Sequence, residues 1–368
     1  MALVNRLAEL VAHDTQNPSG DERPLIDLLA RQLGELGAAD VQVRAVGAHA
    51  FVYARFGAGQ PQVLVNAHAD TVPANSGYTA PPHRLVEQDD RLVGLGAADT
   101  KGAIAAVLEA IAQARAAGTP PAGVAVLFSG DEESAGTCMR RFLTEPALCA
   151  GLKRAIVCEP TGCAVGWRHR GIGAAELTAT SVGGHSSLAD VVPGPVAVLA
   201  RAAVALDDMG RRYRDQGPAG FQGLCMNIAA LDGGLAFNVI PTRATLRFSL
   251  RPAPGADMAA LLVEAERTAR AAVAPVAVDF SVLNANPSFQ TRDLPAFEAL
   301  LGAPARQPID LAFWTEAALL SAAGIDAVVF GPGRIEQAHA PDEFVLRTEL
   351  DAACEAFVGL FSTPVTPG

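Results

Sequence analysis

The chain has 368 residues, about half of them apolar, and a formal net charge of −11 that is spread along the sequence. This composition excludes a disordered chain and allows two domains with a large core. The negative charge disfavours nucleic acid or an anionic membrane as a partner, and no apolar stretch reaches the roughly eighteen residues of a membrane span. Because the sequence starts in a helical pattern without a charged leader, we expect a cytoplasmic protein.

The first 171 residues alternate strand-like and helix-like segments. Residues 25–36 have leucine and isoleucine at helical spacing, with Pro24 suited to the first turn and Gly37 to the C-terminal stop. The segments that follow are strands at 51–56 and 63–67, a helix after Lys101, a strand at 124–129, a helix near 136–144 and a strand at 155–158. This βαβ rhythm predicts an α/β domain with a mostly parallel sheet covered by helices.

Beyond residue 171 the order of elements changes. It reads as strand 174–181, helix 196–209, strands 225–231 and 244–250, helix 258–272 and strand 276–282. The order βαββαβ is typical of the split-βαβ, or ferredoxin-like, sandwich. After residue 284 the earlier rhythm resumes, with a helix at 315–323, a strand at 327–330 and a helix at 349–361. We therefore expect a catalytic domain formed by residues 1–171 and 285–368, with residues 172–284 inserted into it.

Six cysteines are scattered without any CxxC pair, which argues against a disulfide framework or a thiolate zinc site. Buried free thiols are the better interpretation. The cysteines are Cys138, Cys149, Cys158, Cys163, Cys225 and Cys354.

Candidate metal ligands occur in five short groups. The groups are His68-Ala69-Asp70, Asp99-Thr100-Lys101-Gly102, Asp131-Glu132-Glu133, Glu159-Pro160-Thr161 and His339-Ala340-Pro341-Asp342-Glu343. Each group alone is weak, because a His-x-Asp pair is usually an ordinary hydrogen-bonded pair and an acidic run is usually a solvated loop. The first four, however, lie at the ends of apolar runs or on the loops that leave them, where an open α/β sheet places its chemistry. Together they predict a two-metal hydrolytic site.

These five groups and four further motifs resemble those of the dinuclear-zinc deacylases and peptidases, a family that includes aminoacylase, succinyl-diaminopimelate desuccinylase and acetylornithine deacetylase. The resemblance covers the chain nearly from end to end. The added motifs are Gly94-Leu95-Gly96, Gly184-His185-Ser186-Ser187, Thr315-Glu316-Ala317 and Gly331-Pro332-Gly333. The resemblance implies that Asp99 bridges two zinc ions, which cobalt can replace. It also implies that His68 and Glu159 complete the site of one ion, and that Glu133 and His339 complete the other.

Two acidic residues are candidates for supporting roles at these ions. Asp70 lies two residues after His68 in a strand and therefore points the same way, so it can orient the imidazole. Glu132 stands beside the ligand Glu133 without being a ligand, which fits a general base. The resemblance adds residues of the inserted domain: His185 for the oxyanion, Arg251 for a substrate carboxylate and Asn238 of the lid. An ordinary surface ion pair remains the alternative for Arg251.

The same resemblance implies a homodimer in which His185 reaches the active site of the other subunit. The substrate implied is an N-acetyl amino acid, hydrolysed with water in arginine biosynthesis. N-acetyl-L-citrulline is favoured, and N-acetyl-L-ornithine is the alternative, for which Glu316 could bind the cationic side chain. A metallo-dipeptidase or carboxypeptidase of the same family, or a protein that has kept the fold and lost the chemistry, also stays open.

Two other functions find little support. The segment 94–99 starts like a dinucleotide fingerprint but has Asp99 where the third glycine belongs. Ser129 and Ser134 flank the acidic run without a GxSxG elbow. One segment also departs from the family, since residues 78–83 lack its usual tryptophan and phenylalanine, which leaves His83 without an assigned role.

Overall fold

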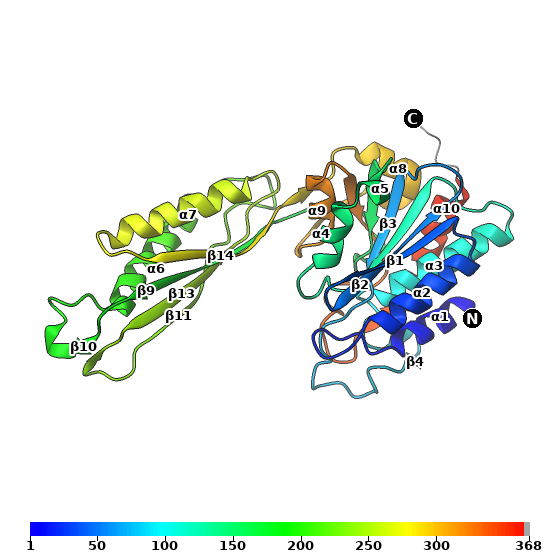
Figure 1. The fold of residues 1–368 in the computed structure, drawn as a ribbon. Coiled ribbons are helices and arrows are strands. Elements are labelled where there is room, and N and C mark those ends of the chain that lie inside the picture. Colours follow the sequence, from blue (N-terminus) through cyan, green and yellow to red (C-terminus); the bar gives the residue numbers. More distant parts are fainter. Residues whose placement is uncertain (364–368) are drawn as a thin grey trace. The chain divides into compact units, whose positions relative to one another are not determined.

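The computed structural model describes residues 1–363, and the chain divides into two compact units (Figure 1). Unit 1 comprises residues 1–167, residues 291–309 and the segment that starts at Thr315, while unit 2 comprises residues 168–290 and 310–314. The insertion expected at residues 172–284 therefore lies within unit 2. None of the helices in the described residues has the length and apolarity that crossing a membrane requires.

The sheet of unit 1 has a parallel centre. Strands β6, β3, β7 and β17 follow one another in this order, and each pairs in parallel with the next. Strands β2 and β1 continue the sheet in antiparallel on one side, and β8 does so on the other. In spatial order the strands are β1 (Asp40–Val46), β2 (His49–Phe56), β6 (Val124–Ser129), β3 (Val63–His68), β7 (Arg154–Val157), β17 (Asp326–Val329) and β8 (Gly166–His169). The four central strands consequently end at one edge of the sheet.

Helices cover both faces of this sheet (Figure 1), which confirms the predicted α/β class. Helices α1, α2 and α3 lie on one face, α10 packs against α3, and α4 and α9 lie on the other face. α3 is buried on almost all sides, because its many alanines allow close approach. The helices are α1 (Ala2–Val11), α2 (Arg23–Glu35), α3 (Lys101–Ala116), α4 (Thr137–Leu143), α5 (Pro146–Cys149), α8 (Leu294–Leu301), α9 (Ala317–Ala322) and α10 (Arg347–Ser362).

Burial explains which strands the sequence predicted. β3 and β6 are buried at every position, so both are continuous apolar runs. The unexpected strand β1 is an edge strand with partly exposed polar side chains such as Asp40, Gln42 and Arg44, and its apolar signal is correspondingly weak. Other strands of this sheet and of unit 1 that were not predicted are short: β4 (Val86–Gln88), β5 (Arg91–Val93), β8 (Gly166–His169), β16 (Ile309–Leu311) and β18 (Phe344–Leu346).

Unit 2 is an antiparallel sheet with two helices packed on it. The strand order is β11-β13-β9-β14, and α6 and α7 contact each other and the sheet. In chain order the elements are β9 (Ile172–Thr180), α6 (Pro195–Arg212), β11 (Asn227–Gly233), β13 (Arg243–Leu250), α7 (Met258–Val273) and β14 (Asp279–Asn286). This is the predicted βαββαβ order. A small ladder of β10 (Gly184–His185) and β12 (Val239–Ile240) continues from β9 and β13, and β15 (Phe289–Gln290) lies where the chain leaves the unit.

Candidate metal centre

The central strands of unit 1 bring acidic and histidine side chains to one edge of the sheet. His68 is the last residue of β3, the acidic run 131–133 follows β6, and Glu159 follows β7. Asp99 lies just before α3, and His339 lies on the loop between β17 and β18. The residues that follow β3, β6 and β7 meet because parallel strands end at a common edge, and the loops that carry Asp99 and His339 reach the same place.

Asp99 lies between two pairs of side chains. Its Oδ1 is 2.9 Å from Nε2 of His68, and its Oδ2 is 3.4 Å from Nε2 of His339. Oε1 of Glu159 lies 4.0 Å from the same His68 nitrogen, while Oε1 of Glu133 lies 2.7 Å from the His339 nitrogen. The two oxygens of the Asp99 carboxylate thus face two pairs of potential metal ligands, each made of a histidine and a glutamate.

Burial governs the ionisation of this cluster. It raises the pKa of Glu159 well above its ordinary range, to which the Asp99 charge adds, and it also raises the pKa of Glu133. For Asp99 the effect of burial is outweighed by hydrogen bonds with His339 and His68, which lower its pKa. The hydrogen bonds of His339 to Asp99 and Glu133 raise its pKa to about 10. The cluster therefore holds more buried carboxylate than two histidines neutralise, and such a site fits bound cations.

The donor atoms also fit a bound divalent metal ion. Ligand atoms of His68, Asp99 and Glu133 all lie within 4.8 Å of one another. Around a tetrahedral zinc ion with bonds of about 2.0–2.1 Å, ligand atoms are roughly 3.3 Å apart, close to the contacts that Asp99 makes with the two histidines. Imidazole and carboxylate are ligands that zinc and cobalt accept.

Asp70 links His68 to the acidic run. Nδ1 of His68 donates to the Asp70 carbonyl oxygen at 3.0 Å, and the Asp70 carboxylate lies 3.5 Å from that nitrogen. The same carboxylate accepts the backbone N–H groups of Glu132 at 3.2 Å and Glu133 at 3.1 Å. Asp70 thus leaves Nε2 of His68 to face Asp99, and it also holds the loop that bears Glu132 and Glu133.

The three acidic residues after β6 have different surroundings. The carboxylate of Asp131 is buried and accepts the N–H groups of Thr137 at 2.6 Å and Cys138 at 2.8 Å, so Asp131 caps α4. Glu133 faces His339, as described. Burial raises the pKa of Glu132 well above its ordinary range, and the charge of Glu133 adds to this although His68 opposes it.

Further residues support this site, and two of them, Asn17 and Asn66, had no predicted role. Nδ2 of Asn17 donates to the Asp70 carboxylate at 2.6 Å, a contact for which the sequence carries no local motif. Oε2 of Glu316 accepts hydrogen bonds from Nδ2 of Asn66 at 2.8 Å and from the Ser129 hydroxyl at 3.3 Å. Asn66 precedes His68 by two residues, and this period-two spacing was a usable signal. Glu316 is only 1% exposed and is turned into the protein.

The divergent segment 78–83 is tied down at both ends. The Asp342 carboxylate accepts the N–H of Thr79 at 2.8 Å and its hydroxyl at 2.6 Å. His83 lies 3.2 Å from the side-chain nitrogen of Gln16 and 3.7 Å from the Asp14 carboxylate, and burial lowers the pKa of His83. His83 therefore packs against the segment between α1 and α2.

The three predicted site residues of unit 2 do not all lie together. His185 in β10 is exposed, its Nδ1 is 2.8 Å from the Ser187 hydroxyl, and the N–H of Ser186 donates to the carbonyl of Asn238 at 3.0 Å. Arg251 is also exposed but follows the opposite end of β13, since the β10–β12 ladder continues from the Arg243 end. The length of β13 separates Arg251 from the other two, about 25 Å at the usual rise of a strand.

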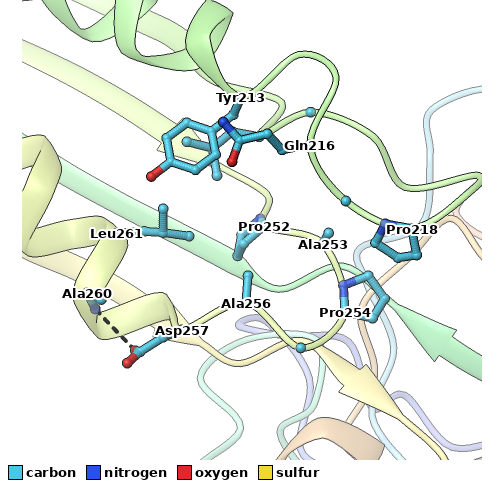
Figure 2. Close-up of a pocket in the computed structure, with 14 residues that line it drawn as sticks. Tyr213, Gln216, Pro218, Pro252, Ala253, Pro254, Ala256, Asp257, Ala260 and Leu261 are labelled. Atoms are coloured by element: carbon cyan, nitrogen blue, oxygen red, sulfur yellow. Dashed lines mark hydrogen bonds between the residues drawn. The ribbon is translucent and has the colours of Figure 1, made fainter.

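A cavity of about 400 Å³ lies elsewhere in unit 2 (Figure 2). Prolines and small residues line most of it, and its polar side chains already have partners. Asp257 caps α7 by accepting the N–H groups of Ala259 and Ala260, and the Tyr213 hydroxyl donates to Glu264 at 2.6 Å. None of the predicted site residues lines this cavity, so it is separate from the metal-ligand cluster.

Comparison with known proteins adds to this description. The model of peptidase family M20/M25/M40 matches residues 64–363. The chain is 34% identical to N-acetyl-L-citrulline deacetylase of Xanthomonas campestris pv. campestris, over 96% of this chain and 95% of the relative. It is 31% identical to acetylornithine deacetylase of Myxococcus xanthus, again over 96% and 95%.

Solved structures share the fold. An M20 family metallo-carboxypeptidase from Sulfolobus solfataricus has a TM-score of 0.77 at 18% identity, covering 98% of this chain and 99% of that one. A dinuclear metal binding peptidase of the M20 family from Bacillus subtilis has a TM-score of 0.72 at 16% identity, covering 98% and 96%.

Proposed function

Because this chain belongs to peptidase family M20/M25/M40, we propose that it is a zinc-dependent amidohydrolase that removes the acetyl group from N-acetyl-L-citrulline in arginine biosynthesis. The observation that carries the hydrolase assignment is the carboxylate of Asp99, whose two oxygens face His68 and His339. The substrate assignment is supported by the 34% identity to N-acetyl-L-citrulline deacetylase. Such a biosynthetic enzyme would work in the cytoplasm.

Two divalent ions would be held by the five proposed ligands. His68 and Glu159 would hold one ion, Glu133 and His339 the other, and Asp99 would be shared. Bound there, the ions would lower the pKa of a water molecule toward neutrality and polarise the carbonyl of the amide. Two contacts support this pairing: Oε1 of Glu159 lies 4.0 Å from Nε2 of His68, and Oε1 of Glu133 lies 2.7 Å from Nε2 of His339.

Glu132 is the proposed general base. The carboxylate of Asp131 is bonded to α4 and that of Glu133 to His339, whereas the hydrogen bond of Glu132 to Asp70 is made by its backbone N–H. The raised pKa of its buried carboxyl suits a group that takes a proton from water and returns it to the departing amine. Asp70 would act as a positioning residue for both Glu132 and His68.

The substrate side chain and carboxylate would be recognised by other residues. Glu316 was the carboxylate available for a cationic ornithine side chain, but it is 1% exposed and bonded to Asn66 and Ser129. Its burial supports the neutral citrulline side chain over ornithine. The exposed guanidinium of Arg251 is the proposed partner of the substrate α-carboxylate, and Asn238 the proposed lid contact.

His185 is proposed to act from the second subunit of a homodimer, where it would stabilise the tetrahedral oxyanion. The chain enters unit 2 at Arg168 and leaves it at Gln290, next to the end of β9 at which Ile172 pairs with Asn286. His185 lies beyond the other end of the nine-residue strand β9, about 30 Å away. The edge strands β11 and β14 offer surfaces for symmetric pairing.

Rates on N-acetyl-L-citrulline, N-acetyl-L-ornithine and N-acetyl-L-methionine, with a dipeptide panel beside them, test the proposal. We expect the highest kcat/KM on N-acetyl-L-citrulline and little turnover of dipeptides. Faster hydrolysis of N-acetyl-L-ornithine would reassign the substrate. Dipeptides as the best substrates would favour a peptidase, the activity named for the structural relative from Sulfolobus solfataricus.

A further inference from the structure

The carboxylate of Glu343 is bonded to the loop that carries Asp99. Oε1 of Glu343 accepts the backbone N–H groups of Ala98 at 2.9 Å and Asp99 at 3.0 Å, and Oε2 accepts the N–H of Gly96 at 3.1 Å. The carbonyl oxygen of Glu343 accepts the N–H of Gly94 at 2.9 Å. Glu343 is 2% exposed. Its oxygens are therefore committed to residues 94–99, and Glu343 is not a further metal ligand.

The path of this loop depends on close packing as well as on these bonds. Gly96 has a φ of 78°, and a Cβ atom there would lie 2.8 Å from the Thr71 side chain and 3.0 Å from that of Lys101. A Cβ atom at Gly102 would lie 2.4 Å from the carbonyl oxygen of Ala97. Glycine is required at both positions, so the loop follows the surrounding surface closely. The Glu343 carboxylate then satisfies the N–H groups that this path leaves pointing inward.

Glu343 also belongs to the segment that carries His339, four residues earlier. His339 has a φ of 57° and Asp342 a φ of 53°, so the backbone adopts the left-handed conformation at both residues and turns sharply there. Nε2 of His339 lies 3.4 Å from Oδ2 of Asp99. One side chain thus joins the backbone of Asp99 to the loop of His339, across 244 positions of sequence.

We infer that Glu343 is a positioning residue of the metal centre, holding the Asp99 carboxylate in place relative to His339 and thereby setting the affinity for the ion that these two residues would share. The inference rests on the metal centre of the proposed function. Glu343 would act through backbone N–H groups and would touch neither ion nor substrate. Removal of comparable supporting partners of metal ligands lowers metal affinity by about 10–100-fold.

The neighbouring residue offers a matched control. The Asp342 carboxylate also accepts three hydrogen bonds, from the N–H and hydroxyl of Thr79 and from the N–H of Ala80. These bonds secure segment 78–83 and leave the Asp99 loop untouched. Asp342→Asn therefore disturbs the same turn by a similar change, without the link that the inference concerns.

Hydrogen exchange of the metal-free protein tests the link directly. In Glu343→Gln the amide oxygen can still accept the N–H groups of Ala98 and Asp99. The amide nitrogen, however, is a donor and cannot accept the N–H of Gly96. Peptides covering residues 94–100 should exchange roughly tenfold faster in Glu343→Gln, and faster still in Glu343→Ala. In Asp342→Asn the faster exchange should be confined to residues 78–83. If residues 94–100 exchange at the wild-type rate in both Glu343 variants, the inference is wrong.

Metal titration by calorimetry, with zinc and then cobalt, tests the consequence. We expect the wild type and Asp342→Asn to bind two ions, and Glu343→Gln to bind the weaker of the two about 10–100-fold less tightly, with kcat partly restored at excess metal. Unchanged affinities in Glu343→Gln would overturn the inference even if exchange changes. A wild type that binds fewer than two ions would instead refute the proposed metal centre, while the exchange experiment would still report on the link between Glu343 and the Asp99 loop.

Discussion

Replacing Glu316 by glutamine should make the stability of the protein depend less on pH. Glu316 is 1% exposed, and Oε2 accepts hydrogen bonds from Asn66 and Ser129, whereas Oε1 has no hydrogen-bond partner in the described residues. Burial raises its pKa from 4.5 to about 7. Glutamine has the shape of the protonated acid, so its oxygen can replace Oε2 and no charge is buried at any pH.

The sign and size of the pH effect on stability follow from the raised pKa of Glu316. Below pH 4.5 the carboxyl is protonated in both the folded and the unfolded chain. As the pH rises toward about 7, the unfolded chain ionises freely while the folded chain keeps its proton, so the contribution of Glu316 to stability is lost progressively. At about 1.4 kcal/mol for each pKa unit, the loss is roughly 3 kcal/mol, of which about 2–3 kcal/mol falls between pH 5 and pH 8. Glu316→Gln lacks this loss.

The assay is denaturant unfolding of metal-free wild type and Glu316→Gln at several pH values from 5 to 8, followed by circular dichroism. Removing the metal keeps pH-dependent metal binding out of the comparison. The variant should gain stability relative to the wild type as the pH rises. Ser129→Ala serves as the control, because it deletes one hydrogen bond to Glu316, costs about 1 kcal/mol and retains the pH dependence. A stability difference between Glu316→Gln and the wild type that stays constant from pH 5 to pH 8 would refute the reasoning.

Substitution, chelation and subunit mixing test the remaining parts of the site. Glu132→Gln should lower kcat by more than the 10²–10⁴-fold typical of general acid–base catalysis, because one residue handles both proton transfers. Elemental analysis should show that the variant keeps both metal ions. A near-normal kcat would mean that another residue is the base. Chelation should abolish turnover, and zinc or cobalt should restore it, whereas full activity without a transition metal would contradict the site. Mixing His185→Ala with Glu132→Gln chains under subunit exchange should give active dimers, with about half of the mixed dimers' sites carrying neither defect. Verified mixed dimers as inactive as their parents would show that His185 does not act in trans.

Local patterns were sufficient to predict much of the fold. The fully buried strands β3 and β6 were recognisable as apolar runs, and the βαββαβ order of unit 2 followed from hydrophobic periodicity and its breaks. The edge strand β1 was missed, because its polar and apolar residues face partly exposed surroundings on both sides. Periodicity reports burial, and it fails where burial is incomplete.

The sequence alone also placed candidate ligands at the ends of strands, since parallel strands deliver their final residues to a common edge. It assigned roles to Glu132 and Glu133 but none to Asp131, whose carboxylate accepts N–H groups at the start of α4. Nor did it indicate that Glu316 is buried or that Glu343 bonds to the loop of Asp99. Each of these depends on partners brought together by folding, and a hydrogen bond across 244 positions leaves no pattern in the residues around either end. Tertiary structure alone decides which of several chemically similar carboxylates faces a ligand, a helix terminus or a loop.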